Sequence, residues 1–161
     1  MAYIDTMTGL GNRTAFLKEN KSNAIFPGMI SYIMMDANNL KTINDTLGHN
    51  KGDELIITIA KCMRKAVGHN GQCYRIGGDE FVIILKNKTA AETEEIINKV
   101  RCEIEFADKQ SDITISVAIG YVWTDTEQKN LEDLMQHADD EMYQDKKKTK
   151  ENKSKENTHS I

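Results

Sequence analysis

Residues 73–85 read CYRIGGDEFVIIL, and this stretch decides the fold. Two short apolar segments, 73–76 and 81–85, flank the turn residues Gly77 and Gly78 and the acidic pair Asp79 and Glu80. Apolar segments of this length around a Gly-Gly turn are typical of a β-hairpin, because glycine adopts the backbone conformations that a tight turn requires. The pattern therefore predicts a hairpin that carries both acidic side chains at its tip.

The segments around the hairpin predict further strands and helices. Residues 29–35 are nearly all apolar and end at Asp36, as expected for a central strand that is buried on both faces. Residues 113–119 alternate isoleucine or valine with other residues, which indicates another strand. Apolar residues at helical spacing predict helices over residues 12–20, 38–47, 53–67, 90–107 and 131–142. This order indicates an α/β fold in which a mixed central β-sheet is flanked by helices.

The composition is that of one soluble globular domain. The chain has 161 residues, of which 39% are hydrophobic and 29% charged. No apolar run approaches the roughly 20 residues that a membrane-spanning helix needs, and residues 1–12 lack the basic and apolar blocks of a signal peptide. Three widely spaced cysteines argue against a disulfide framework and a zinc site. We therefore expect a cytoplasmic protein without a membrane segment.

The charge is distributed unevenly along the chain. The net charge is −4, but residues 144–161 contain six lysines and three acidic residues, so the remainder carries −7. An acidic body with only 6% aromatic residues would repel a phosphate backbone, and we expect no nucleic-acid partner. The lysine-rich, apolar-poor C-terminus predicts a basic, solvated and disordered tail over residues 151–161, behind a domain that spans residues 1–150.

Asp36, at a strand end, and Asp79 and Glu80, at the hairpin tip, are acidic residues that a fold of this kind could bring together. Hard oxygen ligands on rigid strand ends suit Mg²⁺ or Mn²⁺, and such ions neutralise phosphate charge during phosphoryl or nucleotidyl transfer. Acidic residues at turns are more often simply solvated, so spacing alone leaves that alternative open.

Four ordered motifs lie between residues 5 and 150. They are DTMTGLGNR at 5–13, KTINDTLGHNKGD at 41–53, RIGGDEF at 75–81 and ADDEMYQDK at 138–146. The third resembles the signature of GGDEF-domain diguanylate cyclases, and the others resemble that family's opening, nucleotide-binding and closing-helix motifs. The resemblance implies a fold related to nucleotidyl cyclase and polymerase palm domains. It also implies a reaction that joins two GTP into cyclic di-GMP and releases two pyrophosphates.

The resemblance assigns roles to five residues at the reacting centre. Asp36, the Ala37 carbonyl, Asp79 and Glu80 would hold two Mg²⁺ or Mn²⁺ ions, and Asp79 would also accept the proton of the attacking 3′-hydroxyl. Lys41 would place a positive charge on the triphosphate as its negative charge redistributes. Without the resemblance, an exposed helix lysine would be the favoured interpretation of Lys41.

The resemblance also assigns substrate-binding residues, and each has an ordinary structural alternative. Asn44 and Asp53 would read guanine, since a carboxylate accepts from the N1 and N2 donors and an amide pairs with the acceptor edge. Both could instead cap helices. His49 would contact substrate, or it is only a turn residue. Lys146 and Lys150 would reach the terminal phosphates, or they belong to a solvated lysine run.

Departures from the family pattern and the reaction itself set further expectations. Residues 68–71, Gly-His-Asn-Gly, stand where the family's inhibitory Arg-x-x-Asp is found, so that product-inhibition site is expected to be absent. The reaction needs a homodimer, since each 3′-hydroxyl must reach the other α-phosphate, and we expect a missing upstream domain to drive that dimerisation. The alternative is a non-catalytic GTP-binding regulatory or interaction module.

Overall fold

The computed structural model describes residues 2–20, 28–125 and 130–159. No helix in these ranges is both long enough and apolar enough to cross a bilayer. In chain order the elements are α1 (Arg13–Glu19), β1 (Ile30–Ala37), α2 (Leu40–Leu47), α3 (His49–Val67), the 3-10 turn η1 (Gly68–Asn70), β2 (Gly71–Arg75), β3 (Glu80–Lys86), α4 (Ala90–Gln110), β4 (Val117–Thr124) and α5 (Leu131–His159).

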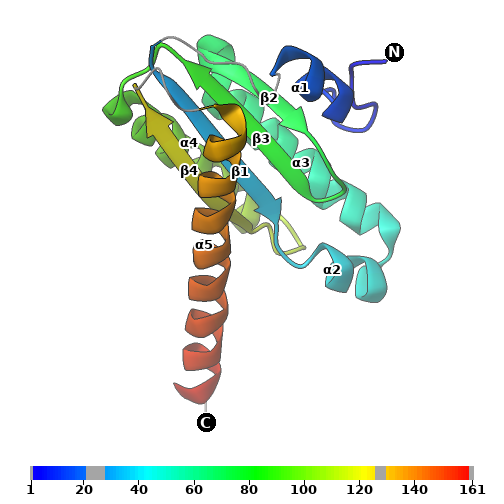
Figure 1. Cartoon of the computed structure of the whole chain (residues 1–161). Helices are drawn as coiled ribbons and strands as arrows, with labels where there is room; N and C mark the ends of the chain where they lie inside the picture. Colours follow the sequence, from blue (N-terminus) through cyan, green and yellow to red (C-terminus); the bar gives the residue numbers. More distant parts are fainter. Residues whose placement is uncertain (1, 21–27, 126–129, 160–161) are drawn as a thin grey trace.

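The described strands form one sheet in the order β2-β3-β1-β4, with helices on both sides (Figure 1). β1 pairs antiparallel with β3 and β4, and β2 pairs antiparallel with β3. The hairpin and the helix-flanked α/β sheet are therefore confirmed. The sequence predicts a mixed sheet, but the strands within the described residues all pair antiparallel. The parallel contact in these residues is a single bridge between Gly11, which lies outside the paired strands, and Tyr74.

The central strand β1 is buried on both faces, as its apolar sequence predicts. On one face, Ile33 and Met35 pack with side chains from α3 and α4. On the other face, Tyr32 and Met34 pack with side chains from α1 and α5, and Figure 1 shows α5 crossing this face over β1 and β4. Because burial of such a side chain contributes about 1.5–3 kcal/mol, the two cores hold the end of β1 firmly in place.

Two elements begin four residues away from their predicted starts. The helix predicted from residue 53 begins at His49, directly after Gly48, whose φ of 92° favours glycine. The strand predicted over residues 113–119 begins only at Val117, where pairing with the last residue of β1 starts. Ile113 and Ile115 are buried as expected, but their N–H groups donate to Ser111 Oγ (3.1 Å) and Asp108 Oδ1 (2.8 Å) instead of to a strand.

The C-terminal segment predicted as a disordered tail is helical as far as the structure describes it. α5 continues through His159 and projects beyond the sheet (Figure 1). Lysine and glutamate are good helix formers, so this segment can be helical without an apolar face. Hydroxyl groups also bond to backbone carbonyls one turn earlier, as from Thr149 to Asp145 (3.2 Å). The described side chains of residues 150–158 are exposed, in agreement with the predicted solvation, and residues 160–161 lie outside the described ranges.

Candidate functional site

The turn between β2 and β3 is fastened to the end of β1. The Ala37 N–H donates to the backbone carbonyl of Asp79 at 2.8 Å, one residue beyond the β1–β3 pairing of Asp36 with Glu80. Arg75 Nη2 donates to the Gly78 carbonyl at 2.9 Å. These two hydrogen bonds to backbone carbonyls of the turn fix the acidic turn beside Asp36.

Arg75 also joins this turn to the N-terminal motif. Its guanidinium lies 3.3 Å from the Asp5 carboxylate, which accepts hydrogen bonds from the Thr8 N–H (2.9 Å) and hydroxyl (2.6 Å). Partial burial alone would raise the pKa of Asp5, but the hydrogen bonds from Thr8 and the charge of Arg75 lower that pKa below its usual range. The opening motif therefore supports the acidic turn from behind.

Asp79 lies next to Asp36 at this point, because its backbone carbonyl accepts the hydrogen bond from Ala37. Asp36 is 6% exposed, and its Oδ1 atom has no hydrogen-bond partner within the described residues. Burial and the neighbouring Asp79 raise the pKa of Asp36 to about 6, against the lowering effect of Lys146. The pairing of β1 with β3 places the Glu80 side chain on the same face of the sheet as Asp36.

Lys146 approaches this carboxyl pair from α5 and forms an ion pair with Asp36 Oδ2. The helix can approach the sheet because Gly120 of β4 has no side chain. A Cβ there would lie 2.7 Å from Met142 Cα, one turn before Lys146. Asp145 holds the same turn in place by accepting a hydrogen bond of 2.9 Å from the Ile119 N–H.

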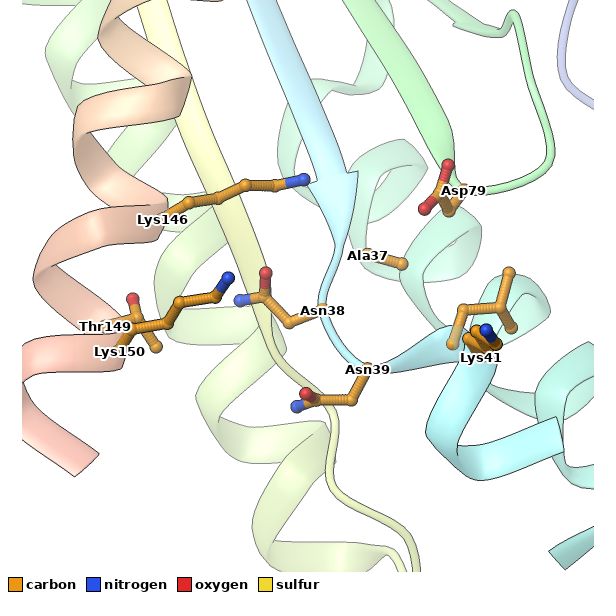
Figure 2. Close-up of a pocket in the computed structure, with 9 residues that line it drawn as sticks. Ala37, Asn38, Asn39, Lys41, Asp79, Lys146, Thr149 and Lys150 are labelled. Atoms are coloured by element: carbon orange, nitrogen blue, oxygen red, sulfur yellow. The ribbon is translucent and has the colours of Figure 1, made fainter. Parts of the chain in front are cut away.

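A cavity of about 360 Å³ opens beside the end of β1, between α2 and α5. We call it the α5-side cavity. Figure 2 shows Lys146 and Lys150 reaching toward it from α5, with Asp79 and Lys41 on the opposite side. The lysines can bind the negative charges of a polyphosphate, and the Asp79 carboxylate can bind a cation that accompanies it. The lining residues are Ala37, Asn38, Asn39, Leu40, Lys41, Asp79, Lys146, Thr149 and Lys150.

A second cavity of about 440 Å³, the α2-side cavity, adjoins the first and shares Leu40, Lys41 and Asp79 with it. Asn44 and His49 also line it, as do Asp45 and Gly78. Asp53 is exposed on α3 and does not line this cavity. The structure thus gathers most of the predicted substrate-binding residues around the two cavities, with Asp53 outside their walls.

The capping alternatives for two of these residues are wrong. α3 begins at His49 with Gly48 at its N-cap, so Asp53 lies in the second turn and caps nothing. Asn44 lies within α2, whose N-cap is Asn39. The spacing of apolar residues misses the first turn of α3, because that turn holds His49, Asn50 and Lys51, which are polar.

Three polar lining residues of the α5-side cavity were given no role in the sequence analysis. Asn39 has a left-handed φ of 66°, a conformation that asparagine tolerates and that turns the chain from β1 into α2. Asn38 donates to Ser116 Oγ at 2.9 Å and ties this turn to the segment before β4. Thr149 lies one turn after Lys146 on α5, which is the sequence signal that could have placed it on the same wall.

Comparison with known proteins decides the family. Residues 2–152 match the family described as "Diguanylate cyclase, GGDEF domain". This chain belongs to the GGDEF domain family. Diguanylate cyclase DgcN of Escherichia coli is 33% identical over 90% of the chain, which spans 37% of that relative. Cyclic di-GMP phosphodiesterase PdeB of Shewanella oneidensis is 27% identical over 86% of the chain, which spans 16% of that relative. The domain therefore corresponds to well under half of each of these longer proteins.

Solved GGDEF domains have the same fold. The GGDEF domain of DgcB from Caulobacter crescentus, crystallised with c-di-GMP, superposes with a TM-score of 0.78 at 24% identity, covering 91% of each chain. In the present GGDEF domain, the segment that replaces Arg-x-x-Asp forms η1 and the first residue of β2. Residues 68–71 read Gly-His-Asn-Gly, so the absence of a product-inhibition site remains a prediction from the sequence that the shared fold does not test.

The carboxyl pair fits a hard divalent cation, a class of ion that the family generally uses. Asp36 contributes a buried oxygen without a donor, and Asp79 contributes a second carboxylate whose negative charge opposes ionisation of the first. Oxygen ligands and an excess of negative charge are what Mg²⁺ and Mn²⁺ require. Within the described residues, His, Cys, Asp and Glu side chains form no cluster of three or more around one metal position. A cation here would therefore need backbone carbonyl, water or substrate ligands as well.

Proposed function

We propose that this chain is the catalytic domain of a diguanylate cyclase, which joins two GTP molecules into cyclic di-GMP and releases two pyrophosphates. The observation that carries the proposal is the position of Asp79, which lines both adjoining cavities and is bonded through its backbone carbonyl to the residue after Asp36. One cavity is lined by lysines and suits a triphosphate. The other is lined by Asn44 and His49 and suits a base.

The proposed metal ligands are Asp36, the Ala37 carbonyl, Asp79 and Glu80, and the proposed ions are two Mg²⁺ or Mn²⁺. Bound there, they would neutralise charge on the triphosphate and lower the pKa of the attacking hydroxyl. Ala37 lines the α5-side cavity, which supports its carbonyl as a ligand. Glu80 pairs with Asp36 in the sheet, but within the described residues Asp36, Asp79 and Glu80 do not form one cluster, so the Glu80 side chain would have to reorient to join a metal.

The side chains of the domain then act on the substrate directly. Asp79 accepts the proton of the 3′-hydroxyl as the bond from that oxygen to the α-phosphorus forms. The bond from the α-phosphorus to the bridging oxygen breaks, and pyrophosphate leaves. Lys41 stabilises the charge that develops on the triphosphate, while Lys146 and Lys150 bind its terminal phosphates.

Guanine recognition is proposed for Asn44 and Asp53, and contact with the substrate is proposed for His49. Asn44 and His49 already line the α2-side cavity, whereas Asp53 is exposed one turn further along α3. A carboxylate at that position can accept from the N1 and N2 donors of a guanine that extends out of the cavity. Adenine lacks this pair of donors.

The reaction requires two copies of the domain related by a two-fold axis. Each copy holds one GTP, and the 3′-hydroxyl of each must reach the α-phosphate of the other. An upstream domain that holds the copies together would supply this arrangement, and the greater length of the relatives is consistent with such additions.

A non-catalytic GTP-binding regulatory module is the second candidate. The observations that favour it are the name of PdeB, a phosphodiesterase, and the position of Lys146, whose ammonium group pairs with a proposed metal ligand. The intact acidic residues Asp79 and Glu80 favour the cyclase.

The deciding experiment incubates concentrated protein, and a version fused to a dimerising helix, with GTP and Mg²⁺ or Mn²⁺. Cyclic di-GMP and the linear dinucleotide are then measured by chromatography. A cyclase makes both products. A regulatory module would bind GTP in a calorimetric titration, and chromatography would recover that GTP unchanged. Absence of product from the fused dimer with either ion contradicts the proposal.

A further inference from the structure

Gly52 lies inside the helix α3, where glycine is an unfavourable residue. It is buried in the first turns of the helix, between Gly48 and the core residue Leu55. Alanine is normally favoured at such a position, because glycine has more backbone freedom to lose when the helix forms. A helix that carries glycine here needs space at that point for something other than a methyl group.

The Asn44 side chain occupies the space. A Cβ on residue 52 would overlap Asn44 Oδ1 and would lie 2.8 Å from Asn44 Cγ. The next neighbour, Leu40 Cδ1, would be 3.2 Å away and would have to move by only a few tenths of an ångström. The conflict is therefore specific to the Asn44 amide, which packs directly against the bare backbone of α3.

The Asn44 amide also borders the α2-side cavity. Its side chain is half-buried, and across residues 2–20, 28–125 and 130–159 we find no hydrogen bond between this amide and another protein group. Its donor and acceptor are thus held in one place by packing against Gly52 and remain available to a ligand in the cavity.

We infer that Gly52 is a positioning residue for base recognition, because it gives the Asn44 amide the place from which that amide binds the guanine base. The inference rests on the proposed role of Asn44 in the cyclase and adds the residue that sets its geometry. Gly52 itself contacts no substrate.

The geometry separates recognition from folding. The displaced group is the end of a short side chain that borders an open cavity, so Asn44 can rotate away from an added methyl group while the backbone stays in place. Gly52→Ala is therefore expected to fold and to lose the fixed position of the amide. Asn44→Ala removes the conflict and provides the matched background.

The experiment measures binding of 3′-deoxy-GTP and 3′-deoxy-ATP, which lack the attacking hydroxyl, with Mg²⁺ by calorimetry. The proteins are the wild type, Gly52→Ala, Asn44→Ala, the double variant and the exposed control Asn50→Ala. We expect Gly52→Ala to bind the guanine nucleotide about 3- to 10-fold more weakly, the range for loss of one neutral hydrogen bond. Adenine-nucleotide binding and the control should be unchanged.

The double variant tests the coupling between the two residues. It should bind the guanine nucleotide no more weakly than Asn44→Ala, and it should melt at a higher temperature than Asn44→Ala, since the methyl group then has room in the helix. If Gly52→Ala alone does not fold, its rescue by Asn44→Ala supports the same conflict. Failure of that rescue overturns the inference.

Two other results would overturn it. Wild-type guanine affinity in Gly52→Ala, with a loss in Asn44→Ala, would show that the amide binds without this packing. If Gly52→Ala weakens guanine-nucleotide binding by the same factor in the Asn44→Ala protein as in the wild type, Gly52 has a packing role only. If Asn44→Ala keeps wild-type guanine affinity, the inference fails, and the separate assay for cyclic di-GMP decides whether the cyclase proposal fails with it.

Discussion

Lys146 on α5 forms an ion pair with Asp36 at the end of β1, 110 residues earlier in the chain. A lysine expected to bind phosphate thus neutralises a carboxylate expected to bind a cation. The other Asp36 oxygen is buried and has no hydrogen-bond partner within the described residues. A divalent cation at Asp36 must therefore compete with the Lys146 ammonium group.

Lys146→Met is expected to raise the affinity for Mn²⁺ alone by about tenfold at pH 8, because it removes a charge-assisted contact of about 1.5 kcal/mol from Asp36. The measurement is calorimetric titration of Mn²⁺ without nucleotide. Lys147→Met is the matched control, since the Lys147 ammonium group lies over the Tyr143 ring, 4.9 Å from its centroid. Equal Mn²⁺ affinity in all three proteins would contradict this competition.

Asp79→Ala is expected to abolish synthesis of cyclic di-GMP while the domain stays folded and retains some GTP binding. The Ala37 N–H bonds to the Asp79 backbone, which the substitution keeps, and loss of the side chain relieves repulsion with Asp36. The melting temperature should therefore stay equal or rise. Asp140→Ala, on the exposed face of α5, is the control. Undiminished synthesis by a folded Asp79→Ala protein would remove this residue from the mechanism.

Asp53→Ser is expected to lower the preference for GTP over ATP by about 10- to 100-fold, since a charge-assisted contact is worth about 1.5–3 kcal/mol. Because Asp53 is not a helix cap, the free energy of unfolding should change by less than about 0.5 kcal/mol. Competition binding and thermal melting measure the two effects, with the exposed neighbour Glu54→Ser as control. Unchanged base preference would mean that Asp53 does not read guanine.

Asp5→Asn is expected to destabilise the domain by about 1 kcal/mol at pH 7, which lowers the melting temperature by about 2–4 °C. The folded-state pKa of Asp5 lies below its ordinary value of 3.8, so ionised Asp5 stabilises the fold above that pH. The difference between wild type and variant should shrink as the pH falls through 3.8 and below. Melting curves from pH 7 to pH 2.5 measure it, with the exposed Glu105→Gln as reference. A difference that persists at low pH would exclude the carboxylate as its source.

Local patterns in the sequence determined most of the elements. The apolar run of β1 and the two apolar segments of the hairpin each predict a strand within a few residues, because burial in the sheet selects apolar side chains. The four motifs likewise carry the family assignment. The acidic residues Asp36 and Asp79 were candidates on the same local grounds.

Only the tertiary structure decided how these residues meet. Close approach of α5 at Gly120 sets Lys146 on Asp36, and contact between α2 and α3 sets Asn44 against Gly52. The strand predicted over residues 113–119 starts late, since β1 ends before residues 113–116 could pair with it. Such contacts join segments that are distant in the sequence, so no local pattern of apolar residues predicts them. They are stabilised by side-chain packing and by ion pairs that are partly buried. The sequence therefore determined the elements and the candidate groups, and packing between distant segments determined the site.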